Sequence, residues 1–268
     1  MFIRSALLAA VAGLAALLSS GWTMAACLGA VSQLRPQIMP ASMRIAAAPP
    51  GSARITFVGH ATFLIETPQG ATAATDYNDY IRPMVRPDIV TMNHAHTTHY
   101  TDAPEPGITH VLRGWEYQGK PARHNVQFKD MRVRNVPTNI RNYYGSGTEY
   151  DGNSIFVFDV ADLCIAHLGH LHHRLTPGHL ADLGKIDVVF VPVDGGLTLN
   201  IFDMQEVITQ IGAPLVIPMH YFSESTLERF LARLRDTHEI KLNNGPTTVV
   251  SRAGLPKKPQ ALVLPGPH

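Results

Sequence analysis

Cysteine is scarce in this chain of 268 residues, which has only Cys27 and Cys164. That number excludes a dense disulfide framework as the main source of stability. An excess of one charge is also absent, because 22 basic residues are matched by 21 acidic ones. The chain therefore lacks the excess of positive charge that is typical of a polyanion-binding protein, and we expect no nucleic-acid partner. Histidine is the residue present in unusual number, with 14 copies that occur in clusters.

The first 27 residues have the pattern of an export signal. Arg4 supplies a positive flank, residues 6–18 form an apolar run, and small residues follow just before Cys27. We expect a cleaved signal peptide, with lipidation at Cys27 and a retained membrane anchor as the two alternatives. In each case the folded part is expected in the periplasm or at the outer envelope, and it meets a membrane only through this segment. Residues 28–52 are expected to be a proline- and alanine-containing linker, and residues 53–268 the folded domain.

The apolar content of 45% is sufficient for the core of one globular domain. Runs rich in valine, isoleucine and phenylalanine predict strands within residues 53–67, 87–93, 153–160, 162–169, 186–193 and 214–220. A threonine cap, a proline and a final glycine predict a helix within residues 176–184, and apolar residues at helical spacing predict helices within residues 200–212 and 223–237. Strands dominate the first half and alternate with helices in the second. This order predicts a layered α/β fold with the sheets inside.

Side chains that can bind a metal stand at the ends of several predicted strands. The histidines at these ends are His94, His96, His99, His167, His170 and His220. Strand ends are where an α/β scaffold usually builds its site. Imidazole is the commonest ligand of zinc, and a catalytic zinc keeps three protein ligands and a water. The pattern therefore predicts a metal centre, in which Asp76 is expected to hold one ligand imidazole by its second nitrogen.

Six features in order along the chain resemble the landmarks of the metallo-β-lactamase superfamily of metal-dependent hydrolases. They are "FVGHATFLIET", Asp76, "NHAHTTH", "IAHLGHLHH", "IDVVFVPVDGG" and "VIPMHY". The nearest branch looks like the one that contains ascorbate-phosphate lactonase-type enzymes. The resemblance covers residues 54–221 and implies a single-domain α/β fold, the four-layer αββα sandwich of that superfamily. It also implies a first metal site of His94, His96 and His167, and a second that uses His99 and His220.

Both carboxylates of the family's metal site are replaced in this chain. The family motif is His-x-His-x-Asp-His, whose Asp position is Thr98 here, and the bridging Asp position is His170. Two divalent ions about 3.5–4 Å apart repel by roughly 20 kcal/mol at an effective dielectric constant of 20, and neutral imidazoles do not offset this repulsion. We therefore expect one tightly held ion and a weak or empty second position. The alternative is that His170 joins His99 and His220 in a second triad of ligands.

The expected function is hydrolysis of a small ester, lactone or phosphoester, in which a metal-bound hydroxide attacks a small-molecule substrate. His170 or His99 is expected to replace the lost acid as the general base, since imidazole titrates near neutral pH. Zinc is the expected metal, although three imidazoles also suit iron, nickel or copper. The alternative function is a non-catalytic metal- or ligand-binding envelope protein of the same fold.

A group of basic residues has two interpretations. Arg132, Arg134 and Arg141 precede Tyr143 and Tyr144. They could orient an anionic substrate through paired hydrogen bonds. They could equally belong to a solvated strand and loop.

Overall fold

The computed structural model describes residues 47–93, 96–142 and 147–267. The predicted signal segment, most of the predicted linker, and His94 lie outside the described residues. The last part of the linker belongs to the fold. Ala48 is buried, and its backbone N–H donates to the Thr67 carbonyl at 3.2 Å. The first strand, β1 (Ser52–Gly59), begins immediately afterwards.

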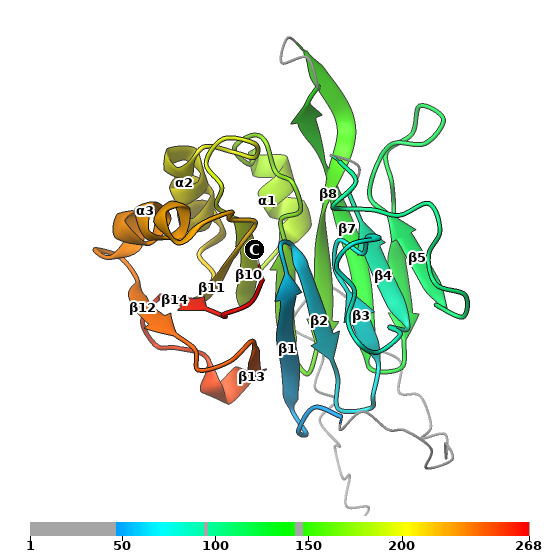
Figure 1. Cartoon of the computed structure of the whole chain (residues 1–268), viewed down its shortest axis with the longest axis horizontal. Coiled ribbons are helices and arrows are strands. Elements are labelled where there is room, and N and C mark those ends of the chain that lie inside the picture. Colours follow the sequence, from blue (N-terminus) through cyan, green and yellow to red (C-terminus); the bar gives the residue numbers. More distant parts are fainter. Residues whose placement is uncertain (1–46, 94–95, 143–146, 268) are drawn as a thin grey trace, which may run out of the picture.

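Two β-sheets form the framework of the molecule (Figure 1). The six-stranded sheet contains, in spatial order, β13 (Thr247–Ser251), β1, β2 (Thr62–Glu66), β3 (Thr72–Ala74), β4 (Ile89–Met92) and β5 (His110–Arg113). The eight-stranded sheet contains β12 (Glu239–Leu242), β14 (Gln260–Val263), β11 (Leu215–Met219), β10 (Val188–Pro192), β9 (Leu163–His167), β8 (Thr148–Val160), β7 (Met131–Arg141) and β6 (Asn125–Phe128). β9, β10 and β11 are parallel neighbours, so their carboxyl ends lie at one edge of the sheet.

The three α-helices are α1 (Pro177–Leu183), α2 (Ile201–Ile211) and α3 (Glu224–Leu234). Their N-caps are Thr176, Asn200 and Ser223, whose side chains accept from backbone N–H groups of the first turn. Gly184 and Gly212 end the first two helices with positive φ angles of 66° and 64°. The structure therefore confirms that the three predicted helices exist and that they begin where the sequence predicts. Within the part of the chain that the structure describes, none of them is long and apolar enough to cross a membrane.

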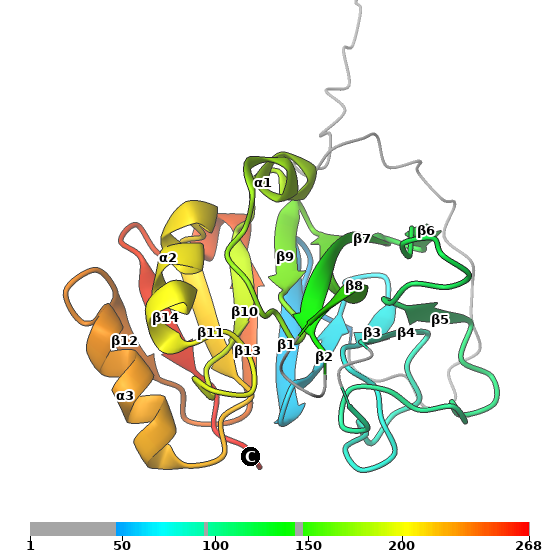
Figure 2. The same ribbon diagram turned by 90° about the horizontal axis from the view of Figure 1, so that it is seen from above.

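The helices pack on the eight-stranded sheet, and Figure 2 shows them on its side of the molecule. Side chains alternate along β9: Ile165 points between the two sheets, whereas Cys164 and Ala166 point toward the helices. A second apolar core, including Phe63 and Phe190 with ring centroids 4.1 Å apart, fills the space between the sheets. The layered α/β fold expected from the sequence is confirmed.

The outer face of the six-stranded sheet is covered by loop residues instead of helices in the described ranges. In the described ranges, Tyr100, Ile108 and Trp115 pack there against Val90 and Met92. These residues lie outside the helices, so loops cover this face, and the second helical layer of an αββα sandwich is not found among the described residues. The part described is thus two sheets with helices on one side.

The basic residues have protein partners. Arg134 donates to the carbonyls of Asp182 and Leu183, which close the end of α1. Arg141 Nη2 donates to three carbonyls of the loop 196–198, at 2.8–3.0 Å. These contacts identify structural roles for both guanidinium groups.

A buried carboxyl group on β8 gives the first prediction. Asp159 is 4% exposed, and neither of its oxygens has a hydrogen-bond partner among the described residues. Its closest cation is Arg132 Nη1 at 3.7 Å. Burial raises the pKa of Asp159 to about 7, against the attraction of Arg134 and Arg132. The folded state therefore keeps this proton between about pH 4 and pH 7, where the unfolded chain has lost it.

The free energy of unfolding should therefore fall as the pH rises from about 4 to 7. The Asp159→Asn variant lacks this titration and should be more stable than the parent at pH 8, by about 2–4 kcal/mol at about 1.4 kcal/mol per pKa unit. Urea unfolding of both proteins at pH 5 and pH 8 measures the difference. Asp162→Asn, in the exposed turn after β8, is the matched control and should follow the parent. Equal pH slopes for Asp159→Asn and the parent would show that the group ionises normally.

Candidate metal centre

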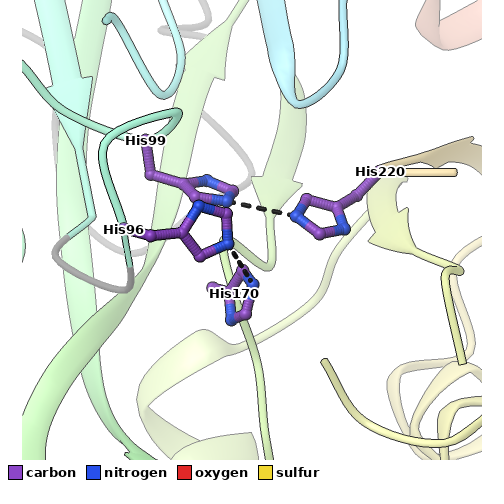
Figure 3. Close-up of side chains that lie close together, drawn as sticks. All are labelled: His96, His99, His170 and His220. Carbon is purple, nitrogen blue, oxygen red and sulfur yellow. Dashed lines mark hydrogen bonds between the residues drawn. The ribbon is translucent and has the colours of Figure 1, made fainter. Parts of the chain in front are cut away.

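Four of the predicted histidines meet where strands from both sheets end. His96 and His99 follow β4, His170 follows β9, and His220 follows β11. Figure 3 shows their rings, from three separate segments of chain, pointing toward a common centre. One ring nitrogen of each lies within 4.8 Å of those of the other three. Converging imidazole nitrogens are a donor set for a transition-metal ion such as zinc.

The contacts within the cluster join Nε2 atoms in pairs. Those of His96 and His170 are 3.0 Å apart, and those of His99 and His220 are 3.2 Å apart. His99 and His220 are fully buried, His170 is 3% exposed, and His96 is partly exposed. The centre is thus closed on most sides and reachable near His96.

Carboxylates hold the second nitrogen of two rings. Asp76 Oδ2 accepts from Nδ1 of His99 at 2.6 Å, and Asp194 Oδ2 accepts from Nδ1 of His220 at 2.9 Å. Because an ionised carboxylate can only accept, each Nδ1 carries the proton and each Nε2 presents a lone pair. Two lone pairs that face each other at 3.2 Å repel unless a cation lies between them. The residues present therefore fit a bound cation.

Burial favours the neutral form of three of these imidazoles. It lowers the pKa of His96, and it lowers the pKa of His99 and His170 well below the usual value, with neighbouring imidazoles adding to the shift. Neutral imidazole is the form that binds a metal. The ring nitrogens are therefore available at neutral pH without loss of a proton.

The two carboxyl groups behave differently. Burial raises the pKa of Asp76 to about 6, against the effects of His167 and of the hydrogen bond from Asn93. For Asp194, burial opposes ionisation, but hydrogen bonds from His220 and Thr198 hold its pKa well below the usual value. Both groups are carboxylates at neutral pH, and together they supply negative charge behind the rings.

Three of the eight described non-glycine residues with positive φ angles lie at this site. His60, Asp76 and His220 have φ angles of 52°, 41° and 54°. The left-handed conformation costs a residue with a side chain about 1 kcal/mol or more, and it persists where the surroundings fix it. Here the His220 N–H donates to the His60 carbonyl at 2.8 Å, and the Asp76 carbonyl accepts from Thr62 at 3.1 Å. The strained positions therefore orient the groups that form the centre.

The structure differs from the first metal site implied by the family resemblance. His94 lies outside the described residues. His167 is fully buried, but its Nδ1 accepts from the Gly169 N–H at 3.1 Å. Its Nε2 consequently carries the proton and donates to the Ala61 carbonyl at 2.8 Å. With both nitrogens bonded to backbone groups, His167 has no lone pair for a metal in this arrangement.

Two residues that are absent from the predicted site belong to it. Asp194 holds His220 and accepts from the backbone N–H groups of residues 196–198. It lies just beyond the end of β10, after Val193, and the rule applied to the other strand ends would have found it. The other residue is His172, whose Nε2 lies 2.6 Å from His170 Nδ1. The sequence carries no signal for that contact.

The role of Asp194 can be tested by a substitution that keeps its shape. In Asp194→Asn, an amide group toward His220 Nδ1 would favour the tautomer that protonates Nε2, which removes a ligand lone pair. We expect zinc affinity to fall about 10–100-fold with little loss of folded structure. Competition with a chromophoric chelator measures the affinity. Asp203→Asn, which changes contacts with Arg174 and with the N-cap Asn200 at the start of α2, is the control and should bind like the parent. Equal affinity in the two variants would contradict the assigned role.

Comparisons with known proteins identify relatives of this chain. The profile of a beta-lactamase superfamily domain matches residues 54–220. A metal-dependent hydrolase of Carboxydothermus hydrogenoformans is 28% identical over 192 residues, which cover 63% of this chain and 84% of that protein. One from Methanoculleus marisnigri is 26% identical over 214 residues, covering 70% and 92%. A crystal structure from Thermotoga maritima, of a proposed zinc-dependent hydrolase of the metallo-beta-lactamase superfamily, covers 81% of this chain and 100% of its own, with 27% identity and a TM-score of 0.59.

Proposed function

The chain belongs to the beta-lactamase superfamily, and from this premise we propose that it is a metal-dependent hydrolase whose histidine cluster holds one divalent transition-metal ion, with zinc as the expected metal. The observation that carries the proposal is the convergence of four imidazole nitrogens within 4.8 Å. A divalent ion held there lowers the pKa of water to about 7 and polarises a carbonyl or phosphoryl oxygen.

We propose an uncharged ester or lactone, rather than a phosphoester, as the substrate class. Arg141, whose backbone N–H contacts His172, has its guanidinium bonded to the carbonyls of residues 196–198. Burial favours the neutral form of His96, His99 and His170, and Asp76 and Asp194 add negative charge behind the rings. Phe222 lies beside the centre, 52% exposed, with its ring centroid 5.3 Å from that of His220. An apolar acyl group matches these surroundings better than a phosphate does.

The proposal retains the resemblance to the ascorbate-phosphate lactonase-type branch, with Thr98 and His170 at the positions of the family's acids. It also retains export through the N-terminal segment. The competing proposal is a metal-binding envelope protein without turnover.

Elemental analysis and a substrate panel test the proposal together. The purified mature protein should carry about one transition-metal ion per chain and should hydrolyse members of an ester and lactone panel faster than phosphodiesters. Dialysis against a chelator should abolish hydrolysis, and added zinc should restore it. His96→Ala should lose both metal and activity, and His94→Ala tests the predicted ligand outside the described residues. Metal without turnover on any ester, lactone or phosphodiester would favour the envelope-protein alternative.

A further inference from the structure

His170 differs from the other three histidines of the cluster in the partner of its second nitrogen. A carboxylate holds His99, another holds His220, and the Thr98 hydroxyl lies 2.8 Å from His96 Nδ1. The Nδ1 atom of His170 instead lies 2.6 Å from Nε2 of His172. Either of these two imidazoles can be the hydrogen-bond donor. The contact that His172 makes with its other ring nitrogen decides which of them donates.

That contact is to a backbone N–H group, which can only donate. The Arg141 N–H points to Nδ1 of His172 at 2.7 Å, so this nitrogen is the acceptor. A neutral imidazole carries one proton, and for His172 it must therefore be on Nε2. That proton points to His170 Nδ1, which must accept in turn. His170 consequently carries its own proton on Nε2, the atom that faces the centre.

The remaining contacts continue in the same direction. The His170 Nε2–H donates to Nε2 of His96 at 3.0 Å, which leaves the His96 proton on Nδ1, toward Thr98. The Thr98 hydroxyl can then donate to His60 Nε2 at 3.1 Å. One direction of donation thus satisfies every ring from His172 to His60.

We propose that His170 is not a metal ligand but a catalytic hydrogen-bond donor, and that His172 is the positioning residue that fixes its tautomer. The inference rests on the proposed function. His96, His99 and His220 are left with Nε2 lone pairs that converge, which is the three-histidine set of a catalytic metal. If the His96 lone pair bound the ion, the buried His170 N–H would lose its acceptor and need another. An oxygen of the reacting group would then be the acceptor, and the donor would stabilise negative charge there.

Metal titrations separate a ligand from a donor. With cobalt or zinc as the probe and the full mature protein, His170→Ala should bind one ion with a Kd within about threefold of the parent and an unchanged cobalt absorption spectrum. His96→Ala should bind at least about 100-fold more weakly. His170→Ala should lower kcat about 10²–10³-fold with a smaller change in KM. A loss of metal in His170→Ala equal to that in His96→Ala would overturn the inference.

The tautomer itself can be observed. Nitrogen NMR of the histidine-labelled protein should show His170 protonated at Nε2, before and after zinc is added, with the signal identified by its absence in His170→Ala. His172→Ala frees His170 to present a lone pair, so kcat should fall while metal affinity rises and the cobalt spectrum changes. A merely structural role for His172 would not raise affinity, and His172→Gln, which keeps a donor, should restore kcat in part. A His170 proton on Nδ1 would refute the inference. A parent protein that binds no metal, but shows the Nε2 tautomer, would instead refute the proposed function alone.

Discussion

Replacement of His99 or His220 by alanine is expected to weaken zinc binding by at least about 10³-fold and to reduce hydrolysis to background, because each removes one of three converging lone pairs. The effect should exceed that of Asp194→Asn, which changes the orientation of a ligand but leaves the ring. His167, the remaining buried imidazole near Asp76, has both nitrogens bonded to backbone groups.

The alanine variant at position 99 changes more than the metal site. His99 supplies the N–H that pairs with the Asp76 carboxylate, and both side chains are fully buried. Removal of one partner of a buried pair costs about 3–5 kcal/mol, because the other is left without compensation. His99→Ala is therefore expected to be destabilised as well as metal-free. His99→Gln offers an amide donor to Asp76 but no imidazole lone pair, so it should fold better and still lose the metal.

The measurements are metal content after dialysis, turnover of the best ester or lactone, and the midpoint of thermal unfolding. His179→Ala is the matched control, since His179 belongs to the capping box of α1 and lies away from the centre. It should keep metal and turnover and lose only about 1 kcal/mol of stability. A His220→Ala protein that retains one tightly bound ion would show that the cluster is not the binding site.

Local signals in the sequence predict the second half of this fold well. Thr176 caps its helix as predicted, because a cap is a contact over a few residues. Asn200 and Ser223, the first residues of the two other predicted ranges, are caps in the structure as well. β7 was missed, although it is long. Its sequence, "MRVRNVPTNIR", mixes buried apolar positions with arginines, and Arg134 is buried only because α1 ends against it. That partner is distant along the chain, so no local pattern contains it.

The candidate site, like the fold, can be predicted from the sequence only in part. The residue types and their location at strand ends are visible in the sequence, and the structure brings His96, His99, His170 and His220 together. Which nitrogen of each ring is free is not visible, because it depends on contacts such as the Gly169 N–H to His167 and His172 to His170. Hydrogen-bond direction thus separates a ligand from a structural histidine, and it is a tertiary property.

The number of ions that the centre holds should change when the two missing carboxylates are supplied. The parent should bind about one equivalent of zinc, and the double variant Thr98→Asp with His170→Asp should approach two. The reason is charge. A pair of divalent ions about 3.5–4 Å apart carries a repulsion of roughly 20 kcal/mol at an effective dielectric constant of 20, which neutral rings do not offset and two carboxylates reduce strongly.

The matched control for this variant has the same shapes without the charges. Thr98→Asn with His170→Asn should stay at one equivalent, because an amide replaces each carboxylate. Equilibrium dialysis followed by elemental analysis gives the stoichiometry of all three proteins. Since Thr98 contacts both His96 and His60, circular dichroism must first show that each variant keeps the parental fold. Two ions in the parent, or one in the folded double variant, would contradict the charge argument. If the amide and acid variants both bind two, geometry rather than charge limits the parent to one.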